Sequence, residues 1–187
     1  TVAFFSTVAF GRISIPILPD CSENEVTNIL NHSESKVLFV SKRLLGNVSK
    51  ECMDNMTLVI DIETFEEIKR DDSKFTCDGK VCHPMPDDIA TINYTSGTTS
   101  DPKGVMLSAR SISSNVEFAI KHMPNQPGWH ILSMLPLGHM YGMAFEFLYP
   151  LASGCHIFFL GKTPTPSVLI KALSEVKPYM LVTVPLV

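Results

Sequence analysis

The stretch from Tyr94 to Gly104 reads "YTSGTTSDPKG" and combines hydroxyl side chains, two glycines, a proline and one lysine. It follows a strand-like run, "IATINYT" (89–95). Such a loop suits a polyphosphate, because backbone N–H groups and hydroxyls donate to phosphate oxygens, while glycines allow close approach. A lysine neutralises part of the phosphate charge. The stretch therefore predicts a phosphate-binding loop, with an ordinary polar turn as the alternative.

The loop does not fit the P-loop of nucleotide hydrolases, which requires G-x-x-x-x-G-K-[ST]. If Gly97 is the first glycine of that motif, the second glycine falls at position 102, where this chain has Pro102. Lys103 precedes Gly104 instead of a serine or threonine. A strand-like run, "GVMLSA" (104–109), then follows where a P-loop continues into a helix. A different kind of phosphate loop is therefore indicated.

The rest of the chain alternates between apolar runs typical of strands and amphipathic runs typical of helices. Continuous apolar strands of this kind predict an α/β fold with a mostly parallel sheet and helices on both faces. Ser22 with Glu25 three residues later predicts a capped helix start. Further strands are expected at 12–18, 36–41, 56–62, 129–137, 155–160 and 179–184, and helices at 2–10, from Ser22 onward, 111–122, 141–151 and 166–176, with a short one at 65–70.

Composition narrows the class of protein. The 187 residues are 45% hydrophobic and 18% charged with a net charge of −4, which is typical of a globular protein. No basic block is present, so nucleic acid is not an expected partner. The apolar runs are too short for a membrane span, and no signal peptide is predicted.

Five cysteines are present, and Cys77, Cys82 and His83 lie close together in the sequence. A zinc site there is one interpretation, but no second paired cluster completes it. Reduced thiols in a cytoplasmic protein are the favoured interpretation.

The order Tyr-Thr-Ser-Gly-Thr-Thr-x-x-Pro-Lys-Gly resembles the phosphate-loop signature of the adenylate-forming superfamily, which includes acyl-CoA synthetases, luciferases and peptide-synthetase adenylation domains. "LPLGHMYGM" (135–143) resembles the second motif of that superfamily, a proline–leucine turn with a histidine before a helix. "GRISIPILPD" (11–20) resembles its upstream strand and turn. "NHSESKVLFVS" (31–41) and "VPL" (184–186) are most similar to long-chain fatty acyl-CoA synthetases.

This resemblance implies that a fatty acid is activated by ATP, with Mg²⁺, to an acyl-adenylate and pyrophosphate, and then transferred to coenzyme A. The implied catalytic residues are His139, near the acyl carboxylate and the α-phosphate, and Lys103, which neutralises the departing pyrophosphate. Thr98 and Thr99 are implied to assist Mg²⁺. The implied phosphate-binding residues are Thr95, Ser96, Gly97, Thr98, Thr99, Ser100, Lys103 and Gly104.

Some assignments leave alternatives. Ser100 stands where the superfamily usually has glycine, so a noncatalytic domain that retains the fold is one alternative, and an enzyme for another carboxylic acid is a second. Tyr141, Met143 and Phe145 are candidates to line an acyl tunnel, or else belong to the core. Trp129 has no motif support and is interpreted as packing.

The sequence shows none of the superfamily's later motifs. We therefore expect residues 1–187 to be a single α/β fragment of the large N-terminal AMP-binding domain, with 63–88 as a surface connection and the C-terminal domain absent. Such a fragment is expected to be inactive alone. The resemblance places the parent enzyme in the cytoplasm and leaves peripheral membrane contact open.

Overall fold

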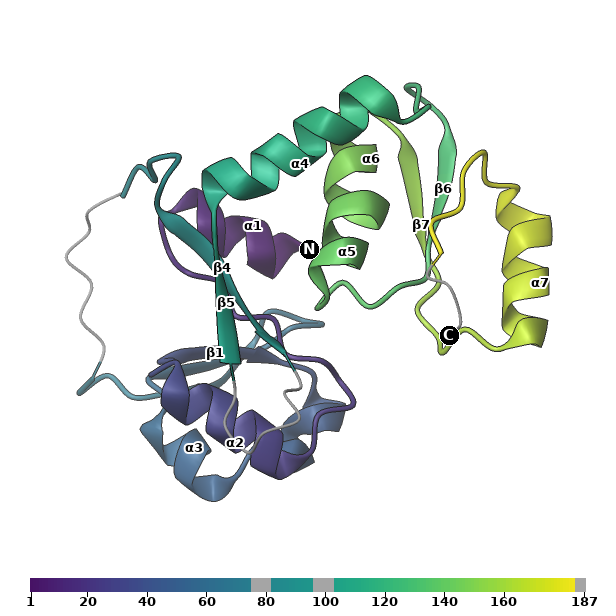
Figure 1. The fold of residues 1–187 in the computed structure, drawn as a ribbon. Helices are drawn as coiled ribbons and strands as arrows, with labels where there is room; N and C mark the ends of the chain where they lie inside the picture. Colours follow the sequence, from purple (N-terminus) through teal and green to yellow (C-terminus); the bar gives the residue numbers. More distant parts are fainter. Residues whose placement is uncertain (75–81, 96–102, 184–187) are drawn as a thin grey trace. The chain divides into compact units, whose positions relative to one another are not determined.

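A computed structural model describes residues 1–74, 82–95 and 103–183. The chain divides into two compact units, Thr1–Met106 and Leu107–Val187. The boundary falls within strand β5 (Lys103–Ser108), which Figure 1 labels.

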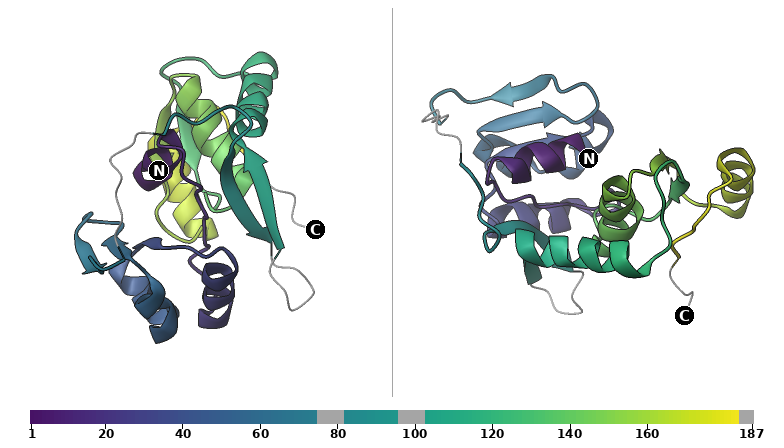
Figure 2. Two further views of the ribbon diagram at one scale, coloured as in Figure 1. Left: turned by 90° about the vertical axis from the view of Figure 1, so that its left-hand side faces the viewer. Right: turned by 90° about the horizontal axis from the view of Figure 1, so that it is seen from above.

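The first unit contains a three-stranded sheet in the order β1-β2-β3. β1 (Val37–Val40) pairs with β2 (Leu58–Asp61) in parallel, and β3 (Glu67–Arg70) pairs with β2 in antiparallel fashion. Figure 2 shows these strands with the helices of the same unit. Those helices are α1 (Val2–Ala9), α2 (Glu23–His32), the 3₁₀ helix η1 (Lys42–Asn47) and α3 (Lys50–Asn55).

Helix α2 begins as its sequence predicts. The Ser22 side chain accepts from the Glu25 backbone N–H, and the Glu25 carboxylate accepts from the Ser22 backbone N–H at 2.8 Å. This reciprocal capping satisfies two amides that the first turn of a helix leaves free. The helix then packs its apolar side on the sheet, in a core of Val26, Leu30, Val40, Cys52, Met56 and Val59.

β4 (Ile89–Thr95) and β5 (Lys103–Ser108) form a separate two-stranded sheet. A parallel bridge joins Thr91 to Ser14. The strand expected over 12–18 is therefore wrong except at Ser14. Pro16 and Pro19 explain this, because proline has no backbone N–H to donate to a ladder.

The second unit places helices around the parallel pair β6 (His130–Ser133) and β7 (His156–Phe159). α4 (Ala109–His122) and α7 (Pro166–Val176) lie close to the predicted bounds. The helix predicted over 141–151 is one helical segment with a π-type middle: α5 (Met140–Gly142), the π-helix η2 (Met143–Leu148) and α6 (Tyr149–Ala152).

The α/β class is confirmed, although the sheets are small and mixed instead of one mostly parallel sheet. The short helix expected at 65–70 is wrong, because Glu67–Arg70 forms β3 on the edge of β2. The final strand expected over 179–184 is reduced to one bridge between Met180 and Ile131, and residue 184 lies outside the described part of the chain. The description of 63–88 as a surface connection stays a prediction.

Within the parts of the chain that the structure describes, no helix is both long enough and apolar enough to cross a membrane.

Candidate active site

The two ends of the predicted phosphate loop lie on paired strands. Thr95 is the last residue of β4 and Lys103 is the first residue of β5, and both are exposed. The predicted residues Ser96, Gly97, Thr98, Thr99 and Ser100 lie outside the described residues. The structure therefore gives the two strands that carry the loop, with a lysine at the start of the second.

Gly104 fits closely against the strand on the other side of the loop. A Cβ atom at Gly104 would lie 2.7 Å from Ile92 Cγ2 and 3.3 Å from Tyr94 Cζ. Real Cβ atoms do not approach carbon at the first of these distances, so a glycine is required here for the present packing. The glycine of the Pro-Lys-Gly sequence thus has a structural reason besides approach to phosphate.

Tyr94, the residue before Thr95, also contacts helix α2. Its hydroxyl lies 2.8 Å from Nδ1 of His32, and the two rings meet edge to face. Sequence reasoning did not single out His32. The "NHSESKVLFVS" segment contained it, but no local pattern relates it to a residue 62 positions away.

His139 lies at the end of a tight turn that follows β6. Its backbone N–H donates to the Pro136 carbonyl at 3.0 Å, and its own carbonyl accepts from Met143 N–H at 3.0 Å. Its side chain is exposed and does not cap the helix that begins after it. At Gly142, a Cβ would lie 2.8 Å from the Pro136 oxygen, so turn and helix are closely packed. The imidazole is thus presented on a firmly held turn.

A buried carboxylate holds the other end of this turn. Glu146 Oε2 accepts from the backbone N–H groups of Met134 (2.8 Å) and Leu135 (2.7 Å), and from the Ser133 hydroxyl at 3.3 Å. Burial raises the pKa of the Glu146 carboxyl, and its hydrogen bonds to Leu135, Met134 and Ser133 oppose that rise. Sequence reasoning missed Glu146, whose signal was a lone acidic residue within the apolar run "MAFEFLYPLA".

The strand predicted over 129–137 ends at Ser133 for the same reason. Met134 and Leu135 donate their backbone N–H groups to a side chain, so these groups are not available for a strand ladder.

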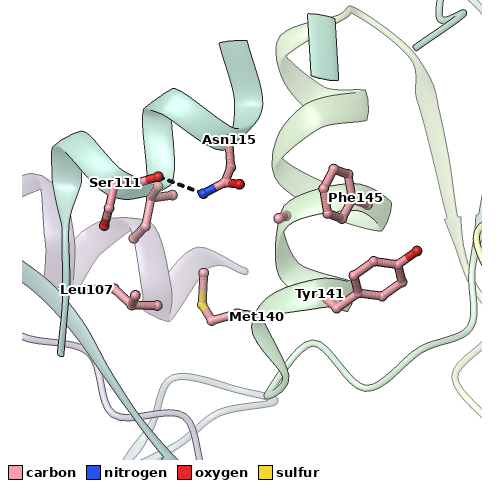
Figure 3. A pocket seen from close by; sticks show the side chains of 8 residues that line it. Leu107, Ser111, Asn115, Met140, Tyr141 and Phe145 are labelled. Atoms are coloured by element: carbon pink, nitrogen blue, oxygen red, sulfur yellow. Dashed lines mark hydrogen bonds between the residues drawn. The ribbon is translucent and has the colours of Figure 1, made fainter. Parts of the chain in front are cut away.

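A mainly apolar pocket of about 200 Å³ lies in the second unit between α4 and the segment Met140–Ala152 (Figure 3). Ser111 and Asn115 lie on α4, and the Asn115 amide donates to the Ser111 carbonyl at 2.9 Å. Of the predicted tunnel residues, Tyr141 and Phe145 line this pocket, whereas Met143 is buried elsewhere. The complete lining is Leu107, Ser111, Ile112, Asn115, Met140, Tyr141, Ala144 and Phe145.

Two further interpretations bear on other residues. Trp129 stacks on Tyr179 with ring centroids 4.8 Å apart, which confirms a packing role. Cys77 lies outside the described residues, and Cys82 is an exposed free thiol. Among residues 1–74, 82–95 and 103–183, no group of three or more His, Cys, Asp or Glu side chains is placed to hold a metal ion.

The sequence over its whole length agrees with one family. A family model described as "AMP-binding enzyme" matches residues 1–187. The chain belongs to the AMP-binding enzyme family. Its membership rests on the whole chain and not on the loop sequence alone.

Curated relatives include acyl-activating enzymes. The chain is 28% identical over 202 residues to long chain acyl-CoA synthetase 5 of Arabidopsis thaliana, a match that covers 95% of this chain and 30% of the relative. It is 40% identical over 105 residues to the probable acyl-activating enzyme 16, chloroplastic, of the same plant, covering 54% of this chain and 13% of that protein. The chain therefore spans at most about a third of the length of these relatives.

The fold is also found among solved structures. The ATP-bound crystal structure of MatB from Rhodopseudomonas palustris aligns with a TM-score of 0.73 at 20% identity, over 94% of this chain and 35% of MatB. At this identity, the likeness establishes the α/β fold and nothing finer.

Proposed function

We propose that this chain provides the triphosphate loop and the acyl-side histidine of a long-chain fatty acid–CoA ligase. The observation that carries the proposal is the loop sequence between two paired strands, with Lys103 opening the second strand and Gly104 packed against the first. The relatives named as long chain acyl-CoA synthetases support the choice of acid.

The proposed reaction depends on positioning and charge neutralisation. The fatty acid carboxylate attacks the α-phosphate of ATP, an acyl-adenylate forms, and pyrophosphate leaves. The thiol of coenzyme A then attacks the acyl carbon, a thioester forms, and AMP leaves. Thr95 and the loop residues would hold the β- and γ-phosphates, and Lys103 would balance the charge of the leaving pyrophosphate. Thr98 and Thr99 would help to hold the Mg²⁺ ion that accompanies the triphosphate.

His139 is proposed to meet the acyl carboxylate and the α-phosphate. Its exposed ring on a hydrogen-bonded turn supports a role that needs a fixed donor. The pocket behind Met140, Tyr141 and Phe145 would take part of the acyl chain. Its volume of about 200 Å³ is below the range of about 300–1,000 Å³ usual for small-molecule sites, so residues beyond this pocket would complete the tunnel.

Residues 1–187 are proposed to be part of the N-terminal AMP-binding domain of a longer, cytoplasmic enzyme. The small share of each relative that the chain spans supports this. The adenine, ribose and coenzyme A sites would then be formed by residues outside 1–187. Peripheral membrane contact of the full-length enzyme is compatible with a long-chain substrate.

ATP–pyrophosphate exchange by the full-length enzyme tests the proposal. Exchange that depends on a long-chain fatty acid, followed by acyl-CoA formation on adding coenzyme A, is the expected result. A series of acids of graded chain length identifies the preferred one. If a short or aromatic acid supports exchange and no fatty acid does, the proposed substrate class is contradicted. The proposed reaction class is then still supported.

An enzyme for another acid remains the second candidate, since one relative is named only as an acyl-activating enzyme. A noncatalytic domain is the third, and Ser100 is its support. Absence of exchange with every acid, in both the natural protein and Ser100→Gly, would favour it. Exchange restored by Ser100→Gly alone would assign the loss to that one position.

A further inference from the structure

Glu146 is a completely buried carboxylate in the middle of the helical segment Met140–Ala152. An uncompensated buried carboxylate is costly, so its partners show what it does in the fold. One oxygen, Oε2, receives all three hydrogen bonds described above, whereas Oε1 has no partner among the described residues.

The backbone donors are the two residues at which β6 ends and the His139 turn begins. Met134 and Leu135 immediately precede Pro136, whose carbonyl accepts from the His139 N–H. The Glu146 carboxylate therefore fixes the direction in which the chain leaves the strand. Without it, two amides at the base of the turn would lose their acceptor.

The turn is also held at its far end by the same helical segment. The His139 carbonyl accepts from Met143 N–H, and Gly142 lies against the Pro136 carbonyl with no room for a Cβ. The segment that carries Glu146 thus holds the turn at two places. The Glu146 side chain binds the chain before His139, and the Met143 backbone N–H binds the His139 carbonyl. This closed arrangement leaves the backbone of His139 little freedom.

We propose that Glu146 is a positioning residue for His139. It acts through the Met134 and Leu135 amides, and it does not touch substrate. The inference rests on the proposed role of His139 in adenylation. In this proposal, the turn is positioned by the hydrogen-bond acceptor Oε2 of Glu146 and not by the negative charge of the carboxylate.

Four variants of the full-length enzyme separate these features. Glu146→Leu keeps an apolar side chain of similar size but removes the acceptor, and Glu146→Gln keeps both size and an acceptor oxygen. Glu146→Asp keeps the charge and withdraws the acceptor by one methylene, and it serves if the leucine variant does not fold. Tyr149→Phe is the matched control, because its buried hydroxyl lies on the same segment and has no hydrogen-bond partner among the described residues.

Two measurements are made on each variant. Hydrogen exchange of the peptide containing Met134 to His139, followed by mass spectrometry, reports on the turn itself. The kcat of adenylation and the KM for ATP, from pyrophosphate exchange, report on its use. A displacement of about 1 Å at a reacting group can cost on the order of a hundredfold in rate.

We expect Glu146→Leu to raise exchange in the turn peptide and to lower kcat by about 10- to 100-fold, with the KM for ATP within about twofold of the natural enzyme. Glu146→Asp should show a smaller loss of the same kind. Glu146→Gln and Tyr149→Phe should match the natural enzyme in both measurements. A purely structural role would not produce a kcat effect that glutamine rescues.

Several results would overturn the proposal. One is an unchanged rate of hydrogen exchange in the turn peptide of Glu146→Leu. A second is faster hydrogen exchange in that variant with a full kcat of adenylation. A third is a loss of kcat in Glu146→Gln as large as that in Glu146→Leu. If Glu146→Leu does not fold, full kcat in Glu146→Asp has the same meaning. The natural enzyme tests the proposed function separately. If it does not catalyse ATP–pyrophosphate exchange, both the proposed function and the positioning role of Glu146 are overturned. A fully active Glu146→Leu overturns only the positioning role.

Discussion

The hydroxyl of Tyr94 meets Nδ1 of His32 at 2.8 Å, although the two residues are 62 positions apart in the sequence. Tyr94 belongs to β4, and His32 is the last residue of helix α2. The same tyrosine ring lies under Gly104, on the strand that returns from the loop. One side chain therefore contacts both α2 and β5, at the base of the predicted phosphate loop.

Removing only this hydroxyl should have a small effect. In Tyr94→Phe the ring still packs on Gly104, and a hydrogen bond to an exposed histidine is lost, so we expect a cost of about 0.5–1 kcal/mol in the free energy of unfolding. Tyr94→Ala, which also removes the ring, should cost clearly more. Denaturant titration measures both. Equal costs for phenylalanine and alanine would contradict a packing role for the ring.

Gly104→Ala should destabilise the β4–β5 pair. The new Cβ would lie 2.7 Å from Ile92 Cγ2, and overpacking of this kind costs about 1–3 kcal/mol. Adding Ile92→Ala makes room, so the double variant should lose less than the sum of the two single ones. Gly46→Ala is the control, because a Cβ there meets no atom within 4 Å. Additive costs in the double variant would show that Ile92 is not the obstacle.

Lys103→Ala should mainly slow adenylation. If the ammonium meets the β- and γ-phosphates, losing a charged contact costs about 2–4 kcal/mol, a factor of tens to hundreds in rate. Pyrophosphate exchange at saturating fatty acid measures the loss, and Lys103→Arg should retain part of the rate. Lys121→Ala, at the exposed end of α4, is the control for surface charge. An unchanged rate in a folded Lys103→Ala would remove this lysine from the mechanism.

Local sequence patterns predicted some elements to their end residues. β4 spans 89–95 and α7 spans 166–176 as expected, because an apolar run ends at the loop in the first case and Pro166 opens a helix in the second. The capping pair Ser22 and Glu25 also depends only on residues three apart. Such features need no knowledge of distant contacts.

The features that the sequence analysis missed depend on contacts with residues distant in the sequence or on pairing with a neighbouring strand. β6 ends early because Glu146, 12 residues beyond Met134, takes the Met134 N–H. β3 replaces the expected helix because Glu67–Arg70 pairs with the exposed edge of β2. For the candidate site, the sequence indicated the loop and His139, but neither His32 nor Glu146 belongs to a recognisable pattern.

Acid should weaken the contribution of Asp61 to stability. Its side chain is only 4% exposed, and the Glu63 backbone N–H, Thr64 and Lys42 hold its pKa below the ordinary value of 3.8. A carboxyl with a lowered folded pKa stabilises the fold above its unfolded pKa and loses that effect as pH falls through the folded pKa. The difference in unfolding free energy between the natural chain and Asp61→Asn should therefore be constant near neutral pH and shrink below 3.8.

Asp20→Asn, at an exposed aspartate, is the matched control for that titration. A difference for Asp61→Asn that grows on acidification would contradict the assigned sign.

Residues 1–187 by themselves should bind pyrophosphate weakly and form no acyl-CoA. Adenylation needs the base, ribose and triphosphate of ATP held together, and the chain spans only about a third of its matched relatives. Backbone donors of the loop and Lys103 should still attract pyrophosphate, with an affinity that falls as salt screens the charges. Calorimetry at two salt concentrations, beside an acyl-CoA assay, measures both properties, and Lys103→Ala in the same 187 residues should weaken binding. Robust acyl-CoA formation by these residues alone would show that the adenine and coenzyme A sites lie within them, contrary to the proposed domain assignment.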